Sequence, residues 1–145
     1  MRNLCRILLV CILSLTSVAQ AGTPPYCWSL DTGLLGVSPT TLKLYAIDMG
    51  GQYSVLGTAS FDIITFPLVT RVRLVNGIAI PVNDKIEISL NASGIEDSEQ
   101  NRLWSGTYHL ILDATTLNGV FLSRASEDAS SNPAISGGAS LAICQ

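Results

Sequence analysis

The chain has few of the residues from which catalytic and metal sites are built. Its 145 residues include one histidine, His109, and four cysteines. A zinc site needs several His or Cys ligands, and a nucleophilic triad needs a base held beside its nucleophile. No Gly-x-Ser-x-Gly motif is present, and His109 falls on the solvent-facing phase of its segment. We therefore predict no catalytic residue, no metal site and no cofactor, and expect the protein not to be an enzyme.

Basic residues are also scarce. Lys and Arg total 8 against 11 Asp and Glu, which gives a formal net charge of −3. Nucleic-acid binding depends on Lys and Arg that neutralise phosphates. The charge balance therefore argues against a nucleic-acid partner and against an anionic membrane surface.

Acidic residues gather in one place, where Glu96, Asp97 and Glu99 lie close together. Carboxylates of this kind can bind calcium, but their spacing does not match the helix-flanked calcium loop. We expect residues 93–101 to form a solvated acidic loop.

The one long apolar run lies at the N-terminus. Arg2 and Arg6 precede an apolar stretch over residues 7–15. In the following Ala19-Gln20-Ala21, the two alanines occupy the positions that a signal peptidase recognises. This pattern is typical of a cleavable signal peptide, and the stretch is shorter than the roughly 20 residues of a membrane helix. We predict a signal peptide over residues 1–21 and a single domain over residues 22–145. The expected location is periplasmic or extracellular, with no membrane span.

Two cysteines lie outside the predicted signal peptide, Cys27 and Cys144. An exported domain with two cysteines most simply forms one disulfide bond. Two buried thiols and a mixed disulfide are the alternatives. We predict a Cys27–Cys144 bridge.

Alternation of apolar and polar residues with a period of two dominates the rest of the chain, which indicates strands. It predicts strands over residues 26–31, 41–48, 52–62, 68–75, 78–82, 85–92, 103–113, 120–124 and 139–144, and no helix. Tight turns are predicted at Asn76-Gly77, Asn83-Asp84 and Asn118-Gly119, since Asn and Gly accept the positive φ that such turns require.

These short strands and tight turns predict an all-β fold, a small antiparallel up-and-down β-barrel of about eight strands. Mid-strand Gly57 and Gly106 support a barrel, because closed sheets bend at glycine. A bridge from Cys27 to Cys144 would also join the first and last strands. A β-sandwich is the alternative.

The predicted hairpin at Asn76-Gly77 places Val72 and Leu74 in the core. It also leaves an outer face that carries both apolar and charged side chains. We interpret this face as a candidate contact patch formed by Arg71, Arg73, Ile78, Ile80, Val82 and Glu87. The alternative is that long Arg and Lys stems simply cover these side chains. A second candidate site is the interior, with ligand contacts from Tyr53, Phe61, Trp104 and Tyr108. Because most inner residues are large, we expect a filled interior and binding on the outside or at the loops.

The predicted function is that of an exported, non-enzymatic binding module for a protein partner or a small apolar ligand. A structural subunit of a cell-surface or envelope assembly is the first alternative, and a small hydrolase is the second. Fold alone does not distinguish them.

Overall fold

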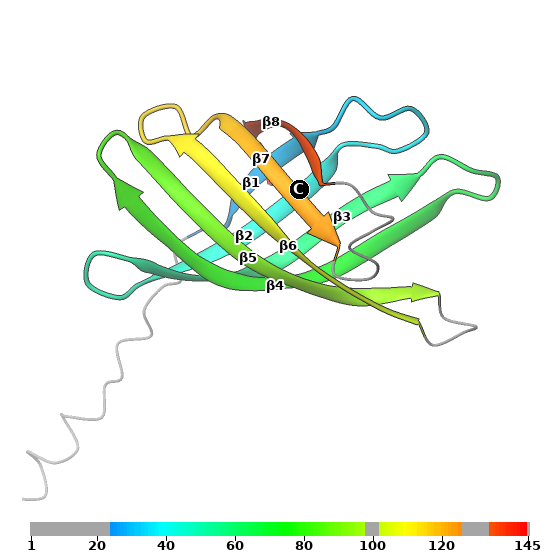
Figure 1. The fold of residues 1–145 in the computed structure, drawn as a ribbon, viewed down its shortest axis with the longest axis horizontal. Coiled ribbons are helices and arrows are strands. Elements are labelled where there is room, and N and C mark those ends of the chain that lie inside the picture. Colours follow the sequence, from blue (N-terminus) through cyan, green and yellow to red (C-terminus); the bar gives the residue numbers. More distant parts are fainter. Residues whose placement is uncertain (1–23, 98–101, 126–133, 145) are drawn as a thin grey trace, which may run out of the picture.

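The structure is a computed structural model and describes residues 24–97, 102–125 and 134–144. Eight strands follow one another in chain order, and each pairs antiparallel with its neighbours. The last strand pairs with the first, so the sheet closes into a barrel (Figure 1). The strands are β1 (Tyr26–Asp31), β2 (Thr40–Asp48), β3 (Tyr53–Ile63), β4 (Val69–Val82), β5 (Lys85–Asp97), β6 (Arg102–Asp113), β7 (Gly119–Ala125) and β8 (Ile135–Ala142).

This architecture confirms the predicted up-and-down barrel and rules out the β-sandwich. The predicted signal peptide, residues 1–21, lies outside the described residues. Within the described ranges there is no helix long and apolar enough to cross a membrane.

The hydrophobic core fills the barrel because alternate residues of every strand point inward. On β6, alternate residues are buried, namely Trp104, Gly106, Tyr108, Leu110 and Leu112, and the residues that alternate with them are exposed or half-buried. The inward side chains form one continuous cluster: Trp28, Leu30, Leu42, Leu44, Val55, Ala59, Val75, Ala79, Ile88, Leu90, Ala92, Trp104, Tyr108, Leu110, Leu112, Phe121 and Ala139. This packing agrees with the expectation that large side chains occupy the interior.

The two ends of the barrel differ. At one end, which we call the turn end, short connections over residues 49–52, 83–84 and 114–118 join the strands. There Trp28 donates a hydrogen bond from Nε1 to the carbonyl oxygen of Leu117 at 2.9 Å. At the other end, the loop end, residues 32–39 and 64–68 form two described connections, and the four long strands β3–β6 extend beyond the short ones (Figure 1).

The predicted hairpin at Asn76-Gly77 is wrong. β4 runs without a break from Val69 to Val82, and neither Asn76 nor Gly77 has a positive φ. Gly77 faces inward, where a Cβ would collide with the Ser89 carbonyl of β5. The glycine thus allows two strands to approach closely in a bent sheet, and it does not form a turn.

The continuous strand reverses part of the predicted core. Along β4, Arg71, Arg73 and Val75 point inward with Ala79, whereas Val72 and Leu74 are exposed on the outer face. A shift of one residue moves every side chain of a strand to the opposite face. The assignment of Val72 and Leu74 to the core is therefore wrong.

Other boundaries also differ from the sequence prediction. The turn predicted at Asn118-Gly119 is a longer connection in which Leu117 carries the positive φ of 57°. β5 continues to Asp97, into the predicted acidic loop, and β8 begins at Ile135. Long antiparallel pairing of β5 with β6 explains the extension, because each added residue satisfies backbone hydrogen bonds. The turn at Asn83-Asp84 is confirmed, with φ of 55° at Asn83.

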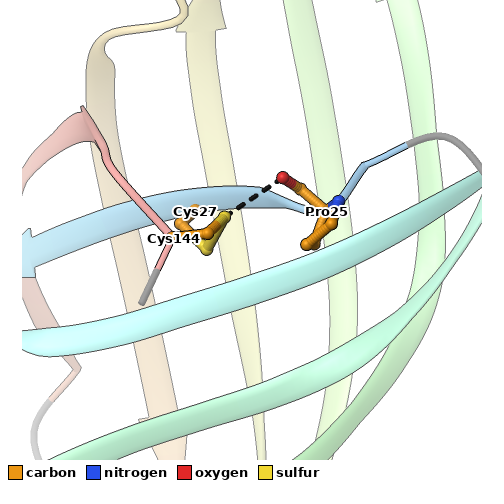
Figure 2. The surroundings of a disulfide bond; sticks show 3 residues. All are labelled: Pro25, Cys27 and Cys144. Atoms are coloured by element: carbon orange, nitrogen blue, oxygen red, sulfur yellow. Dashed lines mark hydrogen bonds between the residues drawn. A yellow bond between two sulfur atoms is a disulfide. The ribbon is translucent and has the colours of Figure 1, made fainter.

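The predicted disulfide bond is present and links Cys27 to Cys144 across 117 positions of the chain. Figure 2 shows it beside Pro25, whose carbonyl oxygen lies 3.1 Å from the Sγ of Cys144. β1 and β8 are also paired through their backbones, from Cys27 opposite Ala142 to Asp31 opposite Gly138. The bridge therefore reinforces the seam at which the barrel closes.

Candidate functional site

The strongest side-chain constellation lies on the inner face near the loop end, and we call it the mouth cluster: Phe61, Arg71, Arg73, Trp104 and Tyr108. The Arg73 guanidinium carbon lies 3.4 Å from the centre of the Trp104 ring and 4.7 Å from that of Phe61. Its Nη1 donates a hydrogen bond to the Tyr108 hydroxyl at 3.3 Å. Two aromatic rings and one hydroxyl thus hold the guanidinium group in place.

Register and glycine explain how this cluster forms. Trp104 faces Gly94 across β5 and β6, and a Cβ at Gly94 would lie 3.1 Å from the Arg73 Cγ. At Gly106, a Cβ would collide with the Trp104 indole ring. The two glycines leave the space that the Arg73 stem and the indole occupy.

The electrostatics of the cluster are those of a cation in aromatic surroundings. Trp104 and Tyr108 are 8% and 4% exposed, and Arg73 is half-buried. Contact with the face of an aromatic ring stabilises a guanidinium ion, by roughly 0.5–2 kcal/mol. Arg71 is the next inward residue on β4 and lies opposite Phe61 on β3. Among the described side chains, which exclude those of Glu96 and Asp97, neither arginine has an acidic partner within ion-pair distance.

Of the four predicted interior contacts, three converge at this mouth: Phe61, Trp104 and Tyr108. Tyr53 does not join them. It starts β3 at the turn end, opposite Asp48, and is 37% exposed. Ligand binding by any of the four stays a prediction.

A second surface of interest is formed by the apolar loop tips, which we define as Leu34, Leu35, Ile64, Phe66 and Leu68. All five side chains are more than half exposed, and Leu35 and Phe66 are fully exposed. The two loops that carry them lie side by side, since Ile64 donates a backbone hydrogen bond to the Gly36 carbonyl at 2.9 Å and Val37 bridges to Ile63. The loop end therefore presents a group of unshielded apolar side chains at the same end of the barrel as the mouth cluster.

The residues of the predicted contact patch lie on opposite faces of the sheet. Arg71 and Arg73 face inward, whereas Ile78, Ile80, Val82 and Glu87 belong to the outer phase of β4 and β5. The reason is the continuous register of β4. An exposed apolar band does run over the outer face of the neighbouring strands, and we call it the outer band: Tyr45, Ile47, Leu56, Val72, Leu74 and Ile78. Whether any of these residues bind a partner stays a prediction.

Two shallow depressions lie on the outer face of β4–β8. One, of about 440 Å³, is crossed by a polar row in which Asn76, Asn91, Thr107 and Arg124 are register neighbours. The other, of about 420 Å³, includes His109 and apolar residues of β7. Both are wide open.

The single histidine makes one notable contact. Its Nδ1 lies 3.1 Å from the Ser89 hydroxyl, on the exposed outer face. A catalytic pair of this kind requires a third group that orients the base, and among the described side chains none is seen hydrogen-bonded to the other ring nitrogen. The described residues also contain no group of three His, Cys, Asp or Glu side chains able to hold a metal ion.

Among the described residues, one carboxyl group has a perturbed pKa, and it lies at the turn end. The pKa of Asp113 is lowered, first by the backbone N–H of Thr116, then by the Thr116 hydroxyl and the backbone N–H of Thr115. These donors lie 2.8, 3.1 and 3.0 Å from its Oδ1. The carboxylate organises the turn over residues 114–118, so we assign it a structural role.

Sequence reasoning missed the inward orientation of Arg73 and the apolar loop tips. The first was accessible in principle, because Arg71, Arg73, Val75 and Ala79 share one phase if residues 69–82 are taken as a single strand. The tips had no periodic signal, since exposure in a loop depends on how the loop folds. The chain matches no protein-family model, no curated protein and no solved structure.

Proposed function

We propose that the chain is an exported, non-enzymatic binding module that recognises a protein partner through the loop end of its barrel. The observation that carries this proposal is the group of apolar loop tips, among which Leu35 and Phe66 have no shielding from water. Adjoining apolar side chains exposed in this way are typical of interaction surfaces. Closed barrels commonly hold such loops on a rigid sheet.

The rest of the molecule supports a surface function. The hydrophobic cluster occupies the barrel interior, which favours a protein partner over a small apolar ligand held inside. The disulfide bond is compatible with an oxidising compartment such as the periplasm or the extracellular space.

Site-specific photo-crosslinking tests the proposal. A benzoylphenylalanine replaces Phe66 in cells that naturally produce the chain, and a matched control places it at Ile143, an equally exposed apolar residue at the turn end. We expect an adduct with one heterologous protein from position 66 and none from position 143. The double variant Leu35→Asp/Phe66→Asp, with the crosslinker moved to position 68, should lose that adduct while keeping the parent's melting temperature. Equal adducts from both ends, or none from position 66, would contradict the proposal.

A structural subunit is the second candidate, and the outer band supports it. This band crosses β2, β3 and β4, where an identical chain would bury it. Sedimentation velocity on the purified domain separates the two candidates. A monomer at micromolar concentration favours the binding module. A concentration-dependent oligomer that Val72→Asp dissolves, and that Val120→Asp on β7 does not, favours the subunit.

A further inference from the structure

We propose that the mouth cluster binds a carboxylate group, which the Arg73 guanidinium receives in its own plane. This inference rests on the proposed function, because the mouth lies at the same end of the barrel, and it names the chemical group that is recognised. The group can belong to a small molecule or to the C-terminus of a peptide.

The geometry defines the approach of the ligand. The Arg73 guanidinium carbon lies over the Trp104 ring, 3.4 Å from its centre, and over the Phe61 ring, 4.7 Å from its centre. Tyr108 accepts a bond from Nη1. A guanidinium group has further N–H donors at its edge, in the fork geometry that matches a carboxylate. The aromatic walls fix this fork, so little side-chain freedom is lost when a ligand binds.

The charge distribution points the same way. The chain as a whole is acidic, with net charge −3, yet the inner face of β4 at the mouth carries Arg71 and Arg73 together. Among the side chains that the structure describes, which do not include those of Glu96 and Asp97, no carboxylate forms an ion pair with either of them. Partial burial costs a cation some of its hydration energy, and a nearby anion can offset that cost. A ligand carboxylate would supply that anion.

The aromatic walls favour a carboxylate over a phosphate. A carboxylate is planar, so both of its oxygens can lie in the guanidinium plane and avoid the ring faces. A phosphate is tetrahedral and would direct some of its oxygens at ring faces, which carry partial negative charge. We therefore expect inorganic phosphate to bind more weakly than a carboxylate.

Titration of the isotope-labelled domain with sodium benzoate tests the inference. We expect saturable shifts of the Arg73 Nε–H and Trp104 indole N–H resonances in the nuclear magnetic resonance spectrum, and none with benzamide, which has the same shape without the charge. Arg73→Lys keeps the charge but loses the fork, and should weaken benzoate binding by about tenfold or more. Arg124→Lys on the outer face of β7 is the matched control and should leave it unchanged.

Three results would overturn the inference. The first is the absence of any benzoate-induced shift in the parent domain, since Arg73 would then only pack against the aromatic rings. The second is equal response to benzamide. The third is an equal loss in Arg124→Lys, which would indicate nonspecific ion pairing. If Arg73→Lys fails to fold, Arg71→Gln replaces it and should weaken binding severalfold.

Further experiments distinguish a small-molecule carboxylate from a peptide C-terminus, and the carboxylate site from the proposed partner surface at the loop tips. A short peptide with a free C-terminus that binds, while its amidated form does not, identifies a peptide terminus, and benzoate binding without peptide binding identifies a small molecule. The variant Leu35→Asp/Phe66→Asp should keep benzoate binding while it loses the crosslinked partner. A partner adduct without benzoate binding would refute the carboxylate site alone.

Discussion

Removal of the disulfide bond should lower stability without opening the barrel. The bridge joins residues 117 positions apart, and a loop of this length restricts the unfolded chain by about 5 kcal/mol in the chain-entropy treatment. Measured losses for small domains are about 2–5 kcal/mol. Native pairing should survive, because β1 stays hydrogen-bonded to both β2 and β8. We therefore expect Cys27→Ala/Cys144→Ala to lose about 2–5 kcal/mol and to keep the parent's spectrum.

Urea unfolding followed by tryptophan fluorescence measures this loss. The parent under reducing conditions is the control, since it breaks the bridge without changing side-chain volume, and it should agree with the double variant to within about 1 kcal/mol. A loss below about 1 kcal/mol would refute the reasoning from loop length. A double variant without native spectrum would refute the claim that the packed interior and strand pairing hold the barrel closed.

Further predictions concern the strands and one turn. Gly77→Ala should cost about 1–3 kcal/mol or more, because its new methyl would collide with the backbone of β5, and thermal unfolding would show it. Leu110→Ala should cost about 3–5 kcal/mol, since Leu110 is fully buried in the core, and urea unfolding measures that loss. The pKa of Asp113 should lie below its ordinary value of 3.8 and rise in Thr116→Ala, as a carboxyl titration by nuclear magnetic resonance would show. Because the folded pKa is the lower one, Asp113 stabilises the protein above pH 3.8 and this contribution is lost as pH falls through the folded pKa.

The fold class was predictable because the sequence pattern is local and repeated. Period-two alternation marks β6 from Trp104 to Leu112. The apolar residues on its inner phase, Trp104, Tyr108, Leu110 and Leu112, are buried as expected. The disulfide bond followed from counting cysteines outside the predicted signal peptide, and the barrel from short turns between neighbouring strands. These features depend on properties that each segment carries by itself.

The site was less predictable because it depends on register across strands. Asn76-Gly77 has the composition of a hairpin turn, but the close approach of β5 at Gly77 explains the glycine instead. A hairpin turn at Asn76-Gly77 would place Arg73 on the outer face of the sheet, where it could not contact Trp104 as it does in the structure. Pairing with neighbouring strands, and not the local sequence, determines which face of the sheet each of these side chains occupies.

The register of β4 underlies both the mouth cluster and the outer band, and one pair of variants tests it directly. Leu74 is 67% exposed and Val75 is 3% exposed, although they are adjacent. The test is to measure the free energy of unfolding of the two variants Leu74→Asp and Val75→Asp. A continuous β4 predicts a change within about 1 kcal/mol for Leu74→Asp and a loss of at least about 3 kcal/mol for Val75→Asp, since only the latter buries an unpaired charge. The opposite order, with Leu74→Asp the destabilised variant, would show that Arg73 faces outward and would contradict the mouth cluster.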